Sequence, residues 1–159
     1  MKHRHHTPRI LTLLTISVAV SLFLSCNSRT IYHKYQDTPV QGWEKNDTLS
    51  FHIPAVDSPG LYYSFLGMRI CKDFPFTDLY LVVEQTILPR TEIVRDTVRC
   101  TIADEEGKLK SRGVTYHQYR FPISAISLNQ GDSVRITVRH CMKRDIMPGI
   151  SDIGIMLSK

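Results

Sequence analysis

Short runs in which apolar and polar residues alternate recur from about residue 47 to the end of the chain. In the clearest run, residues 132–142, Val134, Ile136 and Val138 alternate with hydroxyl and basic side chains. Alternation with a period of two is typical of a strand that has one face in a core and the other in solvent. The same period predicts strands over residues 47–53, 61–71, 77–84, 93–103, 116–123 and 150–157.

Turn-forming residues separate these runs, as in Asp57-Ser58-Pro59-Gly60 and Asp104-Glu105-Glu106-Gly107. Ala125, Ile126 and Leu128 could form one helical turn, and no amphipathic helix of three turns is evident. Seven or eight short strands predict an all-β fold built as a single antiparallel β-sandwich. Alternation alone leaves both a jelly-roll and an Ig-like strand order open.

Two of the predicted strands allow a more specific expectation. Residues 77–84 carry apolar side chains on both faces, which indicates a central strand or one under a second layer. In the run 93–103, Asp96 lies in phase with Val94 and Val98. A buried carboxylate needs partners. We therefore expect Asp96 to accept hydrogen bonds from an arginine of a neighbouring strand or from the backbone.

The N-terminal segment has the composition of a lipoprotein signal peptide. Lys2, Arg4 and Arg9 precede an uncharged, mostly apolar run of fourteen residues, 10–23, and Leu24-Ser25-Cys26 follows it. A basic start, an apolar stretch of this length and a small residue before the cut are typical of secretory signals. The run is shorter than the roughly 20 apolar residues that cross a bilayer. The cysteine makes the segment resemble a lipobox, which implies cleavage before Cys26 and its acylation; a plain secreted protein is the alternative.

These features divide the chain into a signal peptide (residues 1–25), a tether from the acylated Cys26 (26–34) and a β-sandwich domain (35–159). The signal peptide contains three of the 20 basic residues and none of the 15 acidic ones, so the remainder has a net charge of +2. Such a balance does not indicate nucleic-acid binding. Asp and Glu are absent just after Cys26, which favours a domain on the periplasmic side.

No constellation of reactive residues emerges from the sequence. The single histidines after residue 26 and the absence of Cys-x-x-Cys spacing predict neither a metal site nor a cofactor. There is no Gly-x-Ser-x-Gly elbow, so we expect the protein not to be an enzyme. Cys71, Cys100 and Cys141 could form at most one disulfide, and we favour buried, unpaired thiols.

Aromatic residues are the candidate contact sites. Trp43 and several tyrosines could form a platform for sugar rings or for a partner, although a core tryptophan at one end of the sandwich is favoured. Phe74 and Phe76 flank Pro75 in a loop that either plugs the open end of the sandwich, which is favoured, or presents an apolar contact. Arg135, Arg139, Lys143 and Arg144 either protect a strand edge or meet an acidic partner or anionic lipid.

Several segments resemble a known family by their order and spacing. They are Tyr35-Gln36, Gly42-Trp43, Asp47-Thr48, Leu66-Gly67-Met68-Arg69-Ile70, Asp73-Phe74-Pro75-Phe76-Thr77-Asp78-Leu79-Tyr80, Asp96-Thr97, Asp104 to Gly107, Arg139-His140-Cys141-Met142 and Pro148-Gly149-Ile150-Ser151-Asp152-Ile153-Gly154. The chain thereby resembles the gliding-motility lipoproteins of the GldH type, found across the Bacteroidetes. It differs where Cys71-Lys72-Asp73 replaces an Asn-rich stretch.

The resemblance implies an envelope lipoprotein associated with gliding and type IX secretion, with no catalytic or ligand site to carry over. We therefore expect a non-enzymatic protein that is anchored through Cys26 to the outer membrane, faces the periplasm and binds other envelope, gliding or secretion proteins. The alternative is a carbohydrate- or peptidoglycan-binding module, which requires a surface row of coplanar aromatic rings. An enzyme acting on envelope polymers would need a histidine beside two carboxylates.

Overall fold

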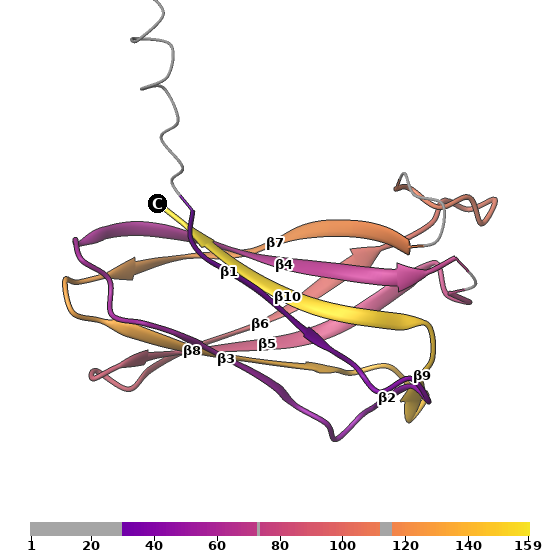
Figure 1. Cartoon of the computed structure of the whole chain (residues 1–159), viewed down its shortest axis with the longest axis horizontal. Coiled ribbons are helices and arrows are strands. Elements are labelled where there is room, and N and C mark those ends of the chain that lie inside the picture. Colours follow the sequence, from indigo (N-terminus) through magenta and orange to yellow (C-terminus); the bar gives the residue numbers. More distant parts are fainter. Residues whose placement is uncertain (1–29, 73, 112–115) are drawn as a thin grey trace, which may run out of the picture.

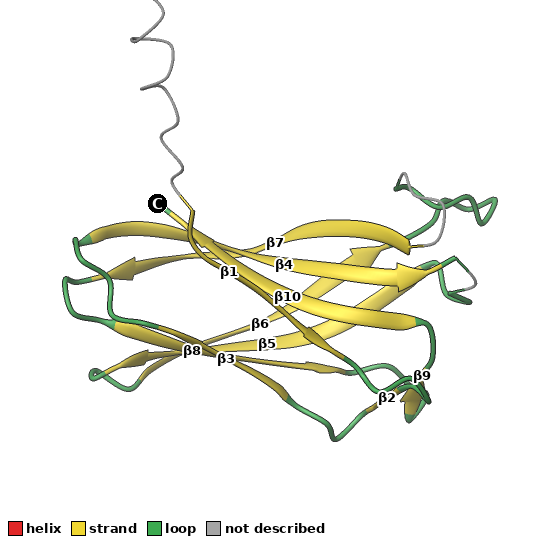
Figure 2. Cartoon of the chain, viewed as in Figure 1, coloured by secondary structure: helices red, strands yellow, loops and turns green. Residues whose placement is uncertain are grey.

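A computed structural model describes residues 30–72, 74–111 and 116–159, and every regular element in them is a strand (Figures 1 and 2). The predicted signal peptide and Cys26 lie outside these residues. The strands are β1 (Thr30–Asp37), β2 (Trp43–Glu44), β3 (Leu49–Ile53), β4 (Gly60–Cys71), β5 (Asp78–Leu88), β6 (Glu92–Thr101), β7 (Tyr116–Leu128), β8 (Ser133–His140), β9 (Ile146–Met147) and β10 (Ile150–Ser158). None of the described residues forms a helix long and apolar enough to span a bilayer.

The long strands form two antiparallel four-stranded sheets that pack face to face (Figure 1). One sheet has the order β1-β10-β4-β7 and the other β3-β8-β5-β6, while β2 and β9 pair separately at one end. Only β5 and β6 follow each other within a sheet; every other connection between long strands crosses to the opposite sheet. This order is that of a jelly roll. The predicted antiparallel β-sandwich is confirmed.

The core consists of the inward faces that alternation defines. In β8, Val134, Ile136 and Val138 are buried, and the residues between them are exposed or half-buried. Burial of such a side chain contributes about 1.5–3 kcal/mol. β5 lies between β8 and β6, so the prediction of a central strand over residues 77–84 is confirmed.

Two segments differ from the prediction. Residues 30–34, expected in the tether, belong to β1, which pairs with β10. β7 continues through Pro122 to Leu128, so the expected helical turn is absent. Because β7 is an edge strand, Pro122 removes no hydrogen bond that a second neighbour needs.

Asp96 is exposed, so the expectation of a buried carboxylate is wrong. It occupies the inward side of β6, in register with Val83, but only the second half of this edge strand, at Val98 and Cys100, is buried. Its Oδ1 accepts a hydrogen bond from the backbone N–H of Thr97 (2.7 Å). A charge on the inward side of an edge strand discourages pairing with another chain.

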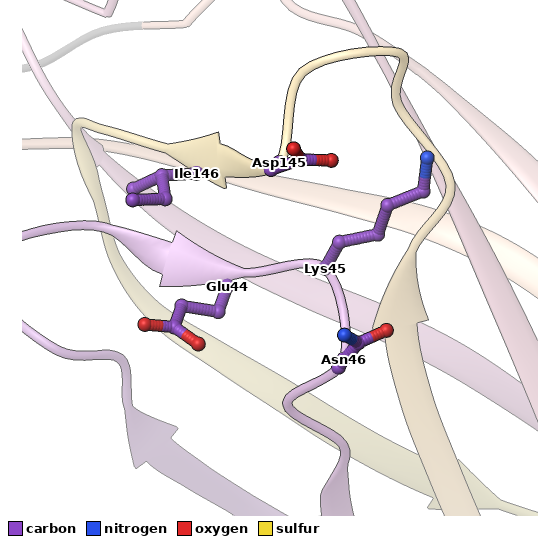
Figure 3. A pocket seen from close by; sticks show the side chains of 5 residues that line it. All are labelled: Glu44, Lys45, Asn46, Asp145 and Ile146. Carbon is purple, nitrogen blue, oxygen red and sulfur yellow. The ribbon is translucent and has the colours of Figure 1, made fainter.

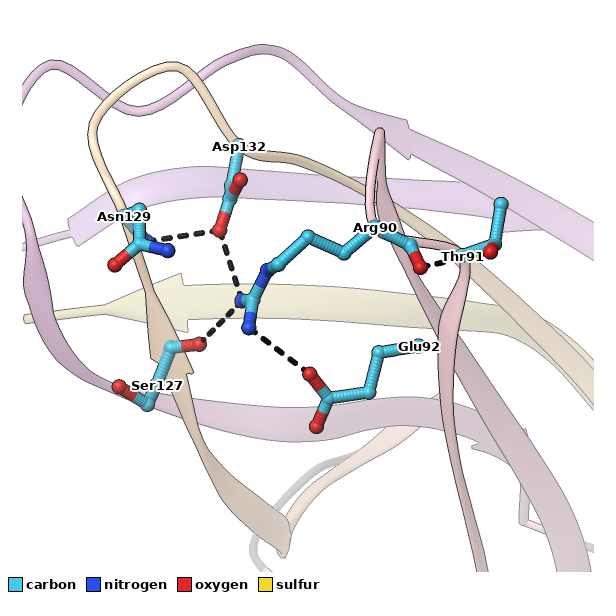
Figure 4. Close-up of polar contacts among 6 residues, drawn as sticks. All are labelled: Arg90, Thr91, Glu92, Ser127, Asn129 and Asp132. Carbon is cyan, nitrogen blue, oxygen red and sulfur yellow. Dashed lines mark hydrogen bonds and ion pairs between the residues drawn. The ribbon is translucent and has the colours of Figure 1, made fainter.

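The two sheets are joined by polar contacts of Arg90, in the turn between β5 and β6 (Figure 4). Its guanidinium donates to the Ser127 carbonyl (3.0 Å) and to Asp132 Oδ2 (2.9 Å). Asp132 is only 4% exposed, and the same oxygen accepts the backbone N–H of Asn129 (2.8 Å). A third contact, to Glu92 Oε2 (3.0 Å), is exposed. Arg90 therefore fastens the β5–β6 turn to the end of β7.

Candidate functional site

Trp43, at the start of β2, is a core residue with 0% exposure. Its Nε1–H donates to the Asp47 carbonyl (3.0 Å), and its ring meets the buried His140 ring edge-on at 5.4 Å. The Trp43 carbonyl also lies 3.1 Å from His140 Nε2. The favoured interpretation of a core tryptophan is confirmed, and Trp43 offers no surface to a partner.

Phe74 and Phe76 close the same end of the sandwich. Phe74 is buried, and its ring meets the half-buried Phe76 ring edge-on at 5.5 Å. Gly149 comes so close that a Cβ there would lie 3.3 Å from the Phe74 ring. The two phenylalanines belong to the core or pack against it. They act as a plug, as favoured from the sequence, and not as an exposed contact.

The aromatic platform expected of a glycan-binding module is not formed by the residues proposed for it. Tyr32 and Tyr62 are buried like Trp43, and Tyr35 and Phe65 are half-buried. Tyr63 alone of that set is exposed, at 47%. The structure therefore contradicts a sugar platform built on Trp43.

An open cavity of about 380 Å³ lies beside β2 and β9 (Figure 3). Glu44, Lys45, Asn46, Asp145 and Ile146 line it. Figure 3 shows the Glu44 carboxylate and the Lys45 ammonium on opposite sides, so these charges do not converge on one point. The backbone N–H of Lys45 donates to the Asp145 carbonyl (2.8 Å) and so joins the two segments that line the cavity. This arrangement is typical of a solvated hollow between two loops.

The outer face of the β3-β8-β5-β6 sheet is rich in arginine; we call it the charged face, with Arg95, Arg99, Arg135 and Arg139 on its exposed side. Arg95 pairs with Glu84, and Arg99 donates to both Asp78 oxygens (3.0 and 3.2 Å). Hydrogen bonds from Arg99 hold the pKa of Asp78 below its usual value. Within the described ranges, Arg135 and Arg139 form no ion pair.

Arg135 and Arg139 lie on β8, which has β3 on one side and β5 on the other. The interpretation of this basic segment as strand-edge protection is therefore wrong for these two residues. Their guanidinium groups stand on a sheet face, where a partner surface can reach them. The remaining alternatives from the sequence are an acidic partner and anionic lipid.

The outer face of the β1-β10-β4-β7 sheet holds a second cluster, around Tyr35. The Tyr35 side chain lies over two glycines of neighbouring strands: an added Cβ would lie 2.5 Å from its hydroxyl at Gly67 and 2.7 Å from its ring at Gly154. The Arg69 guanidinium lies 4.3 Å from the ring centre and pairs with Asp152 (3.8 Å). A hydrogen bond with Asp152 raises the pKa of the exposed Asp37 carboxyl.

Sequence reasoning missed this Tyr35 cluster, although its signal was present. A glycine inside a strand marks a close approach by another group, and Gly67 and Gly154 each interrupt an apolar run. Tyr35, Gly67, Arg69 and Gly154 all fall in segments that carry the family resemblance, and the sheet brings them together.

The reactive side chains of the described residues are dispersed. No three His, Cys, Asp or Glu side chains there lie close enough to hold a metal ion. Cys71, Cys100 and Cys141 are all unpaired; Cys100 is buried, as favoured, but Cys141 is exposed. Burial raises the pKa of Cys100 to about 12 and lowers the pKa of His140.

Comparison with known proteins identifies relatives of this chain. A family model described as GldH lipoprotein matches residues 30–157. A gliding motility lipoprotein GldH homolog of Christiangramia forsetii is 20% identical over 155 residues, which cover 88% of this chain and 90% of that protein. The gliding motility lipoprotein GldH of Flavobacterium johnsoniae is 28% identical over 99 residues, which cover 62% of this chain and 60% of that protein.

Solved structures offer only a distant likeness. A family 35 carbohydrate binding module from Clostridium thermocellum superposes with a TM-score of 0.42 at 16% identity, covering 83% of this chain and 91% of that one. A similarity at this level carries no functional argument.

Proposed function

Because the chain belongs to the GldH lipoprotein family, we propose that it works by contact, without catalysis, within the machinery for gliding and type IX secretion. As a family member it is a membrane-anchored lipoprotein of the cell envelope. We place the lipid on Cys26 and the domain on the periplasmic side of the outer membrane. The observation that carries this proposal is the family match itself, which includes both sheets of the sandwich.

The placement of the ionisable groups supports a role in contact. The carboxylates of Asp78 and Asp132 are held in ion pairs with arginine. His140 is enclosed by the core and has a lowered pKa, so it is poorly placed to exchange protons with a substrate. These groups hold the fold together, and the surface is left to provide recognition.

The charged face is the surface we assign to a protein partner. Arg135 and Arg139 project from the outer face of β8, where a planar guanidinium can form two parallel hydrogen bonds with a carboxylate. Tyr80, in register with Arg99, adds an exposed aromatic ring to the same face. Arginine and tyrosine are both enriched at interface hot spots. The expected partner therefore presents an acidic surface.

Site-specific photo-crosslinking in living cells tests this proposal. A photoreactive residue at Thr97, on the charged face, should capture an envelope protein, whereas one at Ala125, on the opposite outer face, should not. Capture should be lost in Arg135→Glu/Arg139→Glu and kept in Arg120→Glu, a single charge reversal on β7 of the opposite sheet. Capture that survives the double reversal would contradict the assignment of the charged face.

The lipid anchor needs a separate test. Metabolic labelling with a fatty acid should mark the wild-type protein and not Cys26→Ala, and the variant should leave the membrane fraction. Wild-type protein recovered without label in the soluble fraction would contradict anchoring at Cys26.

A further inference from the structure

One outer face of the sandwich carries an exposed apolar patch close to the point where the chain enters the domain. The lipid-facing patch comprises Leu61, Tyr63, Phe65 and Ala125. In β4 the residues between them point into the core, so Leu61 (50% exposed), Tyr63 (47%) and Phe65 point outward. Ala125 of β7 is in register with Tyr63 and continues the patch across the sheet. We propose that the patch rests on the lipid bilayer to which the protein is anchored.

The charge distribution of the two outer faces fits this orientation. β4 and β7 contain no acidic residue, and the acidic residues of β1 and β10, Asp37 and Asp152, lie at the ends of these strands remote from Thr30. Arg120 is exposed on β7, whereas the Lys159 ammonium donates to Ser58 Oγ (2.6 Å) and to the Pro59 carbonyl (3.0 Å) in the loop between β3 and β4. Because the carboxylates of Asp37 and Asp152 are remote from the patch, they do not repel anionic head groups from it, and tyrosine is enriched at the bilayer interface. The charged face, on the other sheet, then points away from the bilayer.

The short distance to Cys26 restricts which surface can reach the lipid; this step rests on the proposed anchor. Three residues lie between Cys26 and Thr30, and the four steps from one to the other span at most about 14 Å. Thr30 is in register with Ser158, and Ser158 with Tyr63, so Tyr63 lies two strands, or about 10 Å, from the start of β1. An acylated Cys26 therefore keeps the patch next to the bilayer at a high effective concentration.

The loops at the same end of the sandwich are the rival contact, and their chemistry is less suitable. The exposed carboxylates at this end are those of Asp57, in the loop between β3 and β4, and of Glu92, at the start of β6. The Arg90 side chain that could offset them is already bonded to Glu92, Asp132 and the Ser127 carbonyl (Figure 4). A bilayer would disfavour these acidic groups, whereas the patch exposes only apolar and aromatic side chains.

Fluorescence quenching by lipid tests the orientation on the full acylated protein. The protein is reconstituted in vesicles of phosphatidylethanolamine and phosphatidylglycerol, whose acyl chains carry bromine near the head group. Three variants each add one tryptophan: Tyr63→Trp in the patch, Tyr80→Trp on the charged face, and Gln130→Trp in the loop between β7 and β8. The sole native tryptophan, Trp43, is fully buried, so its emission can be subtracted as a constant background.

Brominated lipid should remove most of the emission added by Tyr63→Trp and leave that of the other two variants unchanged. Stronger quenching in Gln130→Trp than in Tyr63→Trp would show that the end loops, and not the patch, contact the bilayer, and would overturn the inference. Equal quenching in all three, or none in any, would also overturn the inference. Flotation of the vesicles separates this failure from failure of the anchor: protein that does not float contradicts anchoring, and protein that floats unquenched contradicts only the orientation.

Discussion

Replacing Arg90 by methionine should destabilise the domain more than any other substitution of an exposed ion-pairing residue. Methionine keeps the apolar stem of the side chain and removes the donors to Asp132 and Ser127. Asp132, which is 4% exposed, then keeps only the backbone N–H of Asn129. Its carboxylate becomes a buried charge without a counterion.

The size of the effect follows from the burial of the two partners. Removing one partner of a fully buried ion pair costs about 3–5 kcal/mol. Because the Arg90 side chain is 37% exposed, water can reach the site, and we expect a loss of about 2 kcal/mol in the free energy of unfolding. For a domain of this size, that loss lowers Tm by about 6–8 °C. The exposed pair with Glu92 should contribute less than about 0.5 kcal/mol.

Equilibrium unfolding in urea, compared across three variants, measures this difference. Arg90→Met should lower the midpoint clearly, and Glu92→Gln should leave it nearly unchanged. Arg90→Met/Asp132→Asn should recover part of the loss, because an asparagine oxygen still accepts the Asn129 N–H without carrying a charge. Equal midpoints for Arg90→Met and Glu92→Gln would refute the reasoning that burial of Asp132 makes the contact strong.

Three further predictions concern the interior and the Tyr35 cluster. Gly154→Ala should lower the free energy of unfolding by about 1–3 kcal/mol, because the added Cβ displaces the Tyr35 ring; urea unfolding should show most of this cost removed in a Tyr35→Ala background. Native protein at pH 8 should react with iodoacetamide at Cys141 and not at Cys100, whose pKa is raised to about 12 by burial; mass spectrometry that finds Cys100 alkylated first would contradict this. Because burial lowers the pKa of His140, its ring should stay neutral in the folded protein below pH 6.5, and stability should decrease as the pH falls from 6.5 toward the lowered pKa; an NMR titration midpoint at or above 6.5 would contradict this.

The sequence predicts the strands well where each has one buried face. β8 is the best example, because every second residue from Val134 onward meets the core. β1 escapes prediction because it is an edge strand in which only Tyr32 is buried, so no alternation is visible. The burial expected for Asp96 is wrong for a related reason. The period of two shows which way a side chain points, but the extent of the opposite sheet decides whether that side chain is covered.

The surfaces are less predictable, because they depend on strand order. Tyr35 is 32 residues from Gly67 and 119 from Gly154 along the chain. Only the order β1-β10-β4 puts its ring over both glycines. The strand order also decides how Arg135 and Arg139 are interpreted. Because β8 has neighbours on both sides, these arginines belong to a sheet face and not to a strand edge.

The pairing of β1 with β10 has a mechanical consequence for a tethered protein. If the lipid is attached at Cys26, as proposed, a pull on it enters the domain at Thr30, the end of a strand that has a single neighbour. If the opposite end of the sandwich is held, the tension runs along β1. All of the backbone hydrogen bonds between β1 and β10 are then loaded together in shear. If the pull is instead perpendicular to the strand, these hydrogen bonds break one after another from Thr30, and β1 separates from β10 at a much lower force. The direction of traction would then decide whether the sandwich transmits a load or yields to it.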